Sequence, residues 1–464
     1  MIRRAFAATL LLASAPLHAQ STTQEALQAR YDRALAAGYK ALFLCGAIAN
    51  AERAGARRTG ASVEEWELAG IQAPQAEHIA SLEEDILRIQ TQATATDGSV
   101  RTVGMLLHVE VPWTERMPPR IAIHFAGKGC ALLPIGTSPD AVERDAQADA
   151  AYLQGAASAT QPQIVQSDLA QTGFDPRYGE DTRTTAVVIS RDGSLIGESY
   201  ANDFGPDTPQ RTWSVAKSIA ATLVGATAQR GEADVNASAG LGLDAADPRR
   251  AITIDHLLRM ASGRYSDMPG NRTDPLYWGG STVEETALDW PLVHEPGTVY
   301  RYANNDTLAA VEAIEGTFAD HPPAAFFRKL GMDDTVAETD WRGSYVLSSQ
   351  VWSTARDLAK LGQLYLDDGV LPNGERILPE GWTRYISSPA GPQPDGAFGY
   401  GAGFWLLDKS EGVPPDTYAM MGNRGQYVVI VPSRDVVIVR RGEDPVGARF
   451  DIAAFTRDVL ASLD

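Results

Sequence analysis

The most informative stretch of this chain is Trp213-Ser-Val-Ala-Lys-Ser-Ile-Ala-Ala-Thr-Leu-Val-Gly225, in which Ser214 and Lys217 stand three residues apart at the start of an apolar run. On a helix this spacing puts both side chains on one face, one turn apart. A serine hydroxyl is a weak nucleophile unless a base takes its proton, and an apolar setting lowers the pKa of a lysine so that it can act as that base. The stretch therefore predicts a nucleophile and its base on one helix.

The beginning of this helix adds a second chemical feature. Thr212 or Ser214 makes a suitable helix N-terminus after the proline-containing turn at residues 206–209. A helix start offers backbone N–H groups to a developing oxyanion. The chain has only six lysines, yet a serine three residues ahead of one of them can also arise by chance. Ser214 and Lys217 alone are therefore weak evidence for catalysis, and further motifs are needed to support it.

Two further elements follow in order, Tyr302-Ala-Asn304 and Gly422-Asn-Arg-Gly-Gln426, the last two residues of which start a predicted strand. With Ser214 and Lys217 they resemble the serine β-lactamase and penicillin-binding superfamily, most closely its class C-like branch, which includes esterases and 6-aminohexanoate-dimer hydrolases. The resemblance runs from about residue 184 to residue 441. Other matching phrases are Trp213-Ser-Val-Ala-Lys-Ser218, Asp255-His-Leu-Leu-Arg-Met-Ala-Ser-Gly263, Pro296-Gly-Thr298, Leu330-Gly-Met332, Ser353-Thr-Ala-Arg-Asp-Leu358 and Arg376-Ile-Leu-Pro-Glu-Gly-Trp382.

The resemblance implies a role for each residue of these elements. Ser214 would be acylated and Lys217 would activate it, while Tyr302, its pKa depressed by Lys217, would pass a proton to the leaving group. Asn304 would hydrogen-bond an amide or carbonyl of the substrate. The plainer alternatives are that Tyr302 is a buried aromatic residue on a loop and that Asn304 belongs to a polar turn.

The third element departs from the family's pattern. Many members have Lys or His, one further residue and then Gly on this strand, where the chain has Asn423, Arg424 and Gly425. Gly425 still permits close backbone approach, and the N–H groups of Gln426 and Ser214 would form the oxyanion hole. Asn423 carries no charge where a cation would hold a substrate carboxylate, and strand alternation aims Arg424 to the opposite face. This pattern disfavours β-lactams, which carry such a carboxylate.

The fold class expected is α+β, with a β-lactamase-like transpeptidase fold whose antiparallel sheet is flanked by helices and a helical lobe. We expect a signal peptide at residues 1–19, a small α+β N-terminal unit at 20–137, a connector at 138–175 and a β-lactamase-related serine hydrolase domain at 176–464. The connector is inferred from its weakly patterned composition, rich in Ala, Gln, Asp and Ser.

Apolar spacing and turn residues predict the individual elements. The N-terminal unit has predicted helices at residues 20–42, 63–71 and 79–89 and strands at 103–111 and 120–125. In the larger domain, an Asp192-Gly193 turn joins strands at 185–190 and 194–200. Further helices are predicted at 253–263, with Thr253 as N-cap and Gly263 as stop, at 353–366 and at 449–463, and further strands at 403–407, 426–431 and 435–440.

The first 19 residues have the charged, apolar and small-residue regions of a secretory signal peptide. Their apolar stretch, Ala5 to Ala15, is too short to span a membrane and no cysteine ends it, so neither a membrane anchor nor a lipoprotein is expected. Arg3-Arg4 leaves the choice between Sec and Tat export open. We therefore expect a periplasmic or secreted protein.

Cys45 and Cys130 are an even pair, which suits an exported protein. A disulfide between them would contribute roughly 4 to 5 kcal/mol by the chain-entropy argument, and two separately buried thiols are the alternative.

The formal net charge of −19 becomes −21 when Arg3 and Arg4 leave with the signal peptide, which argues against nucleic acids and anionic membranes as partners. The histidines show no metal-ligand spacing, so no metal or other cofactor is expected.

The sequence as a whole predicts an exported serine hydrolase that cleaves an ester or a small amide through an acyl-enzyme on Ser214. Its partner would be a small-molecule acyl substrate, and the oligomeric state stays open. One alternative, a β-lactamase or a D,D-peptidase of the cell wall, uses the same acylation chemistry. Another is a non-catalytic, penicillin-recognising binding module, against which the retained serine, lysine and tyrosine argue, because binding needs no activated nucleophile.

Overall fold

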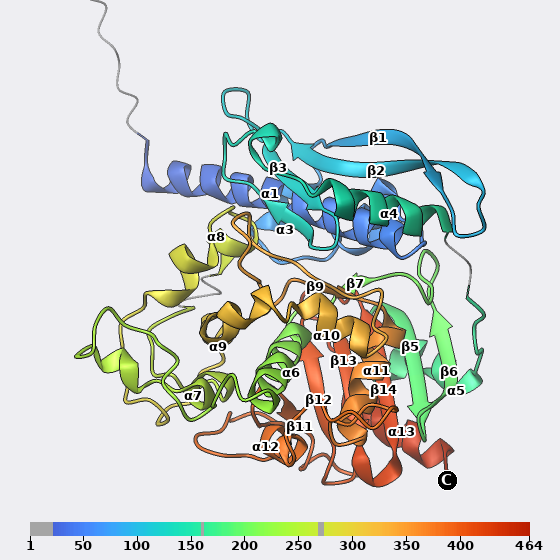
Figure 1. The fold of residues 1–464 in the computed structure, drawn as a ribbon, viewed down its shortest axis with the longest axis vertical. Coiled ribbons are helices and arrows are strands. Elements are labelled where there is room, and N and C mark those ends of the chain that lie inside the picture. Colours follow the sequence, from blue (N-terminus) through green and yellow to red (C-terminus); the bar gives the residue numbers. More distant parts are fainter. Residues whose placement is uncertain (1–21, 159–161, 268–272) are drawn as a thin grey trace, which may run out of the picture.

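A computed structural model describes residues 22–158, 162–267 and 273–464 in two packed parts. An N-terminal α+β unit, blue to teal in Figure 1, lies against a larger domain that holds the rest of the chain. The predicted signal peptide at residues 1–19 lies outside the described residues.

The N-terminal unit is a four-stranded antiparallel sheet, ordered β1-β2-β3-β4, packed against one long helix. Its elements are α1 (Gln24–Arg53), α2 (Gly60–Trp66), α3 (Gln75–Ile79), β1 (Asp85–Thr94), β2 (Val100–Val111), β3 (Arg120–Phe125), β4 (Gly129–Leu132) and α4 (Ala146–Ser158). Helix α1 starts at Thr23, whose side chain accepts a hydrogen bond from the Ala26 N–H and so caps the first turn. The predicted connector contains α4, which packs on β1 and β2.

Helix α1 is long and apolar enough to cross a membrane by length and composition. Its most apolar 18-residue window is nevertheless completely buried inside the protein, from Ala34 to Ala51. Complete burial by other protein segments favours a core helix, since a membrane-spanning helix needs an apolar surface free for lipid.

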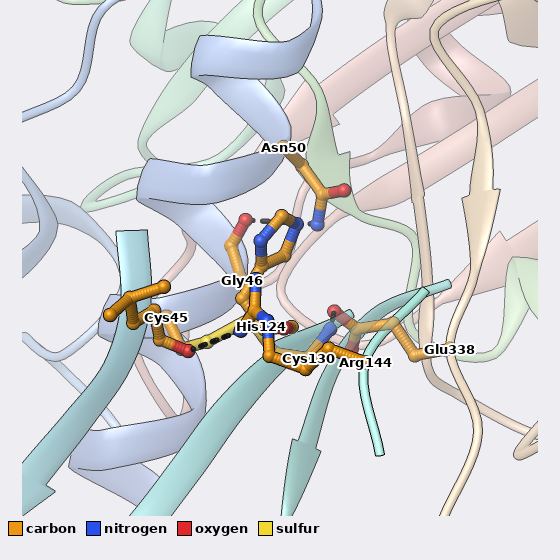
Figure 2. The surroundings of a disulfide bond; sticks show 8 residues. Cys45, Gly46, Asn50, His124, Cys130, Arg144 and Glu338 are labelled. Carbon is orange, nitrogen blue, oxygen red and sulfur yellow. Dashed lines mark hydrogen bonds between the residues drawn. A yellow bond between two sulfur atoms is a disulfide. The ribbon is translucent and has the colours of Figure 1, made fainter. Parts of the chain in front are cut away.

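The two cysteines confirm the predicted pairing. Cys45 of α1 and Cys130 of β4 form a disulfide, with their Cα atoms 6.0 Å apart. Figure 2 shows that Glu338, which belongs to the larger domain, reaches this bridge. Its Oε1 accepts a hydrogen bond of 2.9 Å from the Cys130 N–H, so the two parts of the protein meet at the disulfide.

The larger domain is built on a seven-stranded antiparallel sheet, ordered β10-β11-β12-β13-β14-β5-β6. Its strands are β5 (Thr184–Arg191), β6 (Ser194–Tyr200), β10 (Gly399–Tyr400), β11 (Trp405–Leu406), β12 (Tyr418–Gly422), β13 (Gln426–Val431) and β14 (Val436–Gly442). A second, three-stranded sheet, ordered β7-β9-β8, contains β7 (Gln210–Arg211), β8 (Val336–Ala337) and β9 (Val351–Ser353). These antiparallel sheets flanked by helices confirm the predicted α+β class.

Helices cover both faces of the seven-stranded sheet. The helices of the larger domain are α5 (Asp168–Gln171), α6 (Val215–Gln229), α7 (Ile254–Leu258), α8 (Asp274–Tyr277), α9 (Asn304–Glu315), α10 (Pro323–Lys329), α11 (Ala355–Leu366), α12 (Trp382–Ser387) and α13 (Ile452–Ser462). Those that pack on the sheet include α6 and α11 on one face and α13 on the other. Alternate residues of β13 belong to different cores, Val428 and Ile430 with α6 and α11, and Val429 and Val431 with α13. Such a strand is apolar on both faces, which explains its unbroken apolar sequence.

Two predicted elements differ from the structure, and one strand of the large sheet was missed. The proposed helix at 79–89 is wrong, because α3 ends at Ile79 and β1 begins at Asp85, where it pairs with β2. The helix capped by Thr253 ends at Leu258 rather than near Gly263, since Met260 lies in the left-handed region with φ of 58°. Strand β12 was not predicted at all.

Candidate active site

Ser214 lies at the N-terminal end of α6, in the middle of the larger domain. The preceding residue, Trp213, has φ of 50°, an uncommon conformation for a bulky side chain, and it turns the chain sharply into the helix. Ser214 is half-buried, and no acceptor for its backbone N–H is found among the residues that the structure describes. A free N–H at the nucleophile is what an oxyanion hole requires.

Lys217 is the best-defined polar group of the site. Its Nζ lies 3.2 Å from Ser214 Oγ, 2.6 Å from Asn304 Oδ1 and 2.8 Å from the backbone oxygen of Ser348. The last two are carbonyl oxygens, which only accept hydrogen bonds, so they take both N–H groups of a neutral amine. The remaining lone pair then faces the Ser214 hydroxyl, as a general base requires.

The surroundings of Lys217 also favour the neutral amine. Burial lowers the pKa of Lys217 to about 7, and the carboxylate of Asp267 acts weakly in the opposite direction. Desolvation penalises the ammonium because the interior cannot replace its hydration. A substantial fraction of Lys217 is thus neutral near pH 7.

Tyr302 lies against both members of this pair. Its hydroxyl hydrogen-bonds with Ser214, and its ring centroid lies 5.0 Å from Lys217 Nζ. The predicted depressed pKa is wrong, because burial raises the pKa of Tyr302 and only the hydrogen bond with Ser214 acts in the opposite direction. Lys217 faces the ring and is itself readily neutral, so it gives the phenolate little stabilisation. Tyr302 is therefore a protonated phenol.

Asn304 begins α9, where its side chain is held at both ends. The oxygen accepts from Lys217, and Nδ2 donates to Thr273 Oγ1 at 3.0 Å. Two residues further on, Asp306 accepts from Ser262 at 2.7 Å and pairs with Arg264 at 3.0 Å, which anchors the start of the helix. In this arrangement Asn304 orients Lys217, and its predicted contact with substrate stays a prediction.

The structure changes the roles within the third element. Gly425 does permit a close approach, but to Arg440 and Asp444, whose side chains an added Cβ would meet. The glycine beside the serine is Gly422, at the end of β12, where an added Cβ would lie 3.0 Å from Ser214 N and 2.4 Å from the Thr212 oxygen. Gly425 belongs to the turn at residues 423–425, which joins β12 to β13.

The neighbours of Gly422 and Gly425 have distinct surroundings. Asn423 is exposed, whereas Arg424 is buried and paired with Glu443 at 2.8 Å. Arg424 lies in the turn between β12 and β13, with φ of 56°, so the strand alternation used to place its side chain does not apply. The side chain of Gln426 is buried, where it accepts a hydrogen bond of 2.6 Å from Arg441. Its predicted N–H contribution to the oxyanion hole stays a prediction.

Sequence reasoning missed an aromatic wall beside the nucleophile. The ring of Tyr302 lies 5.5 Å from that of Trp405 and 6.1 Å from that of Tyr400, and Tyr300 packs on Tyr400 at 5.6 Å. The run Tyr400-Gly-Ala-Gly-Phe-Trp405, in which aromatic residues stand on either side of a short glycine-containing stretch, was the available signal. Ser348 and Asp267 were also missed, since each acts from a loop without a motif of its own.

The comparisons with known proteins agree with this geometry. The sequence profile of the Beta-lactamase family matches residues 168–461, more than half of the chain. The chain belongs to the Beta-lactamase family. The match begins at α5 and ends in α13, so it takes in Ser214, Lys217, Tyr302 and β12. The superfamily predicted from the sequence is thereby confirmed.

Two relatives by sequence carry different names. A 6-aminohexanoate-dimer hydrolase of Paenarthrobacter ureafaciens is 26% identical over 297 residues, 57% of this chain and 74% of that protein. Penicillin-binding protein 4 of Amycolatopsis lactamdurans is 26% identical over 301 residues, 55% of this chain and 77% of that protein.

Solved structures confirm the β-lactamase-like fold. A Bacillus anthracis protein provisionally assigned as a 6-aminohexanoate-dimer hydrolase has a TM-score of 0.51 and 20% identity, covering 61% of this chain and 79% of that one. A Bacteroides dorei protein provisionally assigned as a β-lactamase has a TM-score of 0.50 and 18% identity, covering 63% and 96%. At such identities the likeness shows the fold alone.

No group of three His, Cys, Asp or Glu side chains that could hold a metal is found within residues 22–158, 162–267 and 273–464. The polar groups gathered at Ser214 are instead an amine, a phenol, an amide and backbone groups. This Beta-lactamase family site is thus suited to acyl transfer through the serine.

Proposed function

We propose that this member of the Beta-lactamase family is an exported serine hydrolase that cleaves an ester or a small amide through an acyl-enzyme on Ser214. The observation that carries the proposal is the position of Lys217. Two carbonyl oxygens occupy the directions of its N–H groups, and Ser214 Oγ lies 3.2 Å away in the third. This is the arrangement that a neutral lysine needs to accept the serine proton.

Acylation follows from the contacts of the site. The Ser214 proton passes to Lys217 Nζ as Oγ attacks the substrate carbonyl, and a new O–C bond forms with a negative charge on the carbonyl oxygen. The free N–H of Ser214 stabilises that oxyanion. On collapse the bond to the leaving group breaks, Tyr302 donates its phenolic proton to the leaving oxygen or nitrogen, and the ammonium of Lys217 restores that proton.

Deacylation reverses these transfers with water as the nucleophile. A water molecule near Tyr302 and Lys217 loses a proton to the base and attacks the ester carbonyl. The second oxyanion collapses with cleavage of the Ser214 O–C bond, and the serine oxygen regains a proton through Tyr302 or Lys217. The acid is released and the site returns to its starting protonation state.

The surroundings of β12 support a substrate without an obligatory carboxylate. Asn423 is uncharged, and the guanidinium of Arg424 is engaged by Glu443 rather than directed toward Ser214. The partly exposed rings of Tyr302 and Trp405, which pack on the buried Tyr400, offer apolar surface to an acyl or leaving group. The name of the Paenarthrobacter ureafaciens relative makes small linear amides reasonable candidates beside esters.

Covalent labelling of Ser214 tests the proposal directly. A fluorophosphonate should modify the folded wild-type protein at Ser214, as mapped by mass spectrometry, and p-nitrophenyl esters or linear amides should be hydrolysed. Ser214→Ala should lose both reactions while keeping its circular dichroism spectrum. A folded wild-type protein that is neither labelled at Ser214 nor active on any acyl substrate contradicts the mechanism.

A β-lactamase or D,D-peptidase is the second candidate, favoured by the family match and by the Amycolatopsis lactamdurans relative. Nitrocefin and a D-alanyl-D-alanine peptide distinguish it from the first candidate. Rapid turnover of either, with negligible ester or linear amide hydrolysis, would replace the first candidate. A binding module would instead show reversible ligand binding without any turnover.

Export is part of the proposal and has separate support. Residues 1–19 have the pattern of a signal peptide, and the disulfide of Cys45 and Cys130 suits an oxidising compartment. Mass spectrometry of the N-terminus of protein recovered from the periplasm or medium would reveal the cleavage. Full-length protein confined to the cytoplasm would contradict export.

A further inference from the structure

The N-terminal unit contacts the residue that precedes the nucleophile, although the family match begins only at residue 168. Phe43, in the middle of α1, lies with its ring centroid 5.7 Å from that of Trp213, the residue before the nucleophile. Trp213 also packs edge-on against Trp278 at 6.3 Å. A bulky residue with positive φ keeps that conformation only when its surroundings hold it, and α1 supplies part of those surroundings here.

Arg211 connects Phe43 to both sides of the catalytic pair. Its guanidinium lies against the rings of both Phe43, at 4.8 Å, and Trp213, at 4.6 Å. One of its nitrogens donates to Ser349 Oγ at 2.9 Å. Ser349 follows Ser348, whose carbonyl fixes one N–H of Lys217. The guanidinium thus links α1 to the backbone before Ser214 and to the acceptor of its base.

The close fit of α1 leaves little freedom for these contacts to shift. A Cβ on Gly38 would lie 2.1 Å from the backbone oxygen of Trp278, and a Cβ on Gly46 would lie 2.6 Å from the ring of Trp352. Both glycines therefore allow the helix backbone to lie directly on the larger domain. Phe43, between them in the chain, is 1% exposed.

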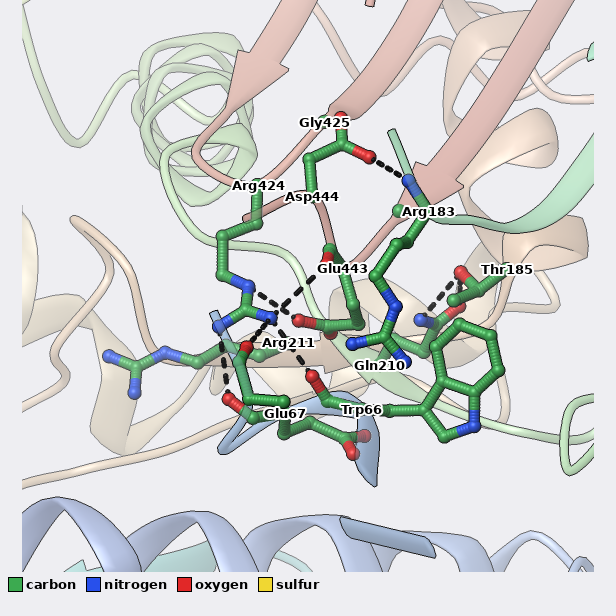
Figure 3. A network of polar contacts seen from close by, with 12 residues as sticks. Trp66, Glu67, Arg183, Thr185, Gln210, Arg211, Arg424, Gly425, Glu443 and Asp444 are labelled. Atoms are coloured by element: carbon green, nitrogen blue, oxygen red, sulfur yellow. Dashed lines mark hydrogen bonds and ion pairs between the residues drawn. The ribbon is translucent and has the colours of Figure 1, made fainter. Parts of the chain in front are cut away.

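A second contact holds the end of β12, and Figure 3 shows it. Arg424, in the turn after Gly422, donates to the backbone oxygens of Trp66 at 2.9 Å, Glu67 at 3.1 Å and Ala69 at 2.7 Å. These three carbonyls belong to the end of α2 and the loop that follows it. Because Gly422 lies against Ser214, the N-terminal unit also fixes the strand that borders the nucleophile.

We propose that the N-terminal unit is a positioning part of the active site, in which Phe43, through Arg211 and Trp213, sets the placement of Ser214 relative to Lys217. The proposal rests on the proposed function, since it concerns the efficiency of the same serine. A misplacement of about 1 Å can cost up to about a hundred-fold in rate, so loss of this support should be visible in turnover.

The test compares Phe43→Ala with Ile48→Ala in the full chain. Ile48 is also a buried residue of α1, but it lines a cavity with Ile86, Arg88 and Gly104 of the N-terminal sheet. Both variants lose buried apolar volume, whereas only Phe43→Ala removes the support behind Trp213. Active sites are counted by fluorophosphonate labelling, so that kcat refers to folded protein alone.

We expect Phe43→Ala to lower kcat per labelled site by about ten-fold or more, with KM nearly unchanged. Ile48→Ala should lower the melting temperature while kcat per labelled site stays at the wild-type value. Phe43→Leu, which keeps more of the volume, decides the matter if Phe43→Ala does not fold, and it should lower kcat in the same direction. Wild-type kcat per site in the folded Phe43 variants would overturn the positioning role alone. A wild-type protein that is unlabelled and inactive would overturn both proposals.

Discussion

The proton affinity of Lys217 is set by its position rather than by a charged partner. Nζ is buried against two carbonyl oxygens, and desolvation is the largest influence on its pKa, while Asp267 opposes it. Carbonyl dipoles hold the amine without supplying the full negative charge that would keep it protonated. The site can therefore keep a lysine ready as a base near neutral pH.

The activity should follow the deprotonation of Lys217. Since burial lowers the pKa of Lys217 to about 7, the amine is protonated and inactive below that pH and neutral above it. We expect kcat/KM, and the rate of fluorophosphonate labelling, to rise with pH and to level off above about pH 8. A pH profile of both quantities checks this, and a rate that falls between pH 6 and 8 would contradict it.

Asn304→Asp provides the control for that assignment. A carboxylate in place of the amide oxygen, which lies 2.6 Å from Nζ, would stabilise the ammonium and raise the pKa of Lys217. The rising limb of the profile should therefore move to higher pH in this variant. An unchanged limb would assign the titration to another group.

At the scale of single residues, the sequence was most informative where the partners share one element. Ser214 and Lys217 could be paired because a helix fixes the distance between positions three apart. The acceptor at Ser348 could not be found, because a backbone oxygen on a loop 131 residues away leaves no mark in side-chain identity. The pKa of Tyr302 was misjudged for a similar reason, since burial is a property of the assembled site.

Among the elements, the end of β12 is the most sensitive neighbour of the nucleophile. Gly422→Ala would place a Cβ 2.4 Å from the Thr212 oxygen and 3.0 Å from Ser214 N, so the strand or the start of α6 must move. We expect kcat/KM to fall by about ten- to a hundred-fold while the fold is retained. Ester hydrolysis and circular dichroism measure the two quantities.

The matched control is Gly316→Ala, at the end of α9, where an added Cβ meets no atom within 4 Å. This variant should keep wild-type kcat/KM. Equal activity of Gly422→Ala and Gly316→Ala would show that the end of β12 tolerates displacement and has no part in the geometry of the site.

Local signals predicted some elements well and failed for others. The hairpin of β5 and β6 was confirmed because Asp192-Gly193 supplies the positive φ angles that its turn needs. The false helix at 79–89 arose because apolar residues spaced by three and four bridge the boundary between α3 and β1. Strand β12, Tyr418-Ala-Met-Met-Gly422, carries little β-propensity and forms because β11 and β13 pair with it on either side.

On the scale of the whole molecule, the two parts share one apolar core. Residues of α1 pack in the same cluster as Trp213, Trp278 and Trp352 of the larger domain. The composition of residues 20–137 predicted an α+β unit and its disulfide, but not this shared core, because burial of α1 depends on a partner more than a hundred residues away. We expect the two parts to unfold in one transition.

The disulfide should contribute strongly to that transition. It closes a loop between residues 85 positions apart, for which the chain-entropy argument gives a stabilisation of roughly 4 to 5 kcal/mol. Cys45→Ala combined with Cys130→Ala should lower the free energy of unfolding by about that amount in urea titrations. The oxidised wild-type protein is the reference, and an unchanged midpoint would contradict the expectation.

The burial of α1 also matters for the expression of a shortened protein that keeps only the residues matched by the family, 168–461. Protein that starts near residue 168 would lose Phe43 and its neighbours and leave Trp213, Trp278 and Trp352 facing water. A contiguous exposed aromatic surface of that kind promotes aggregation, and copies of the shortened protein would associate through it. Poor solubility of such a fragment would then result from the loss of α1 from the shared apolar core. Inactivity of the fragment would not be evidence against catalysis by the full-length protein.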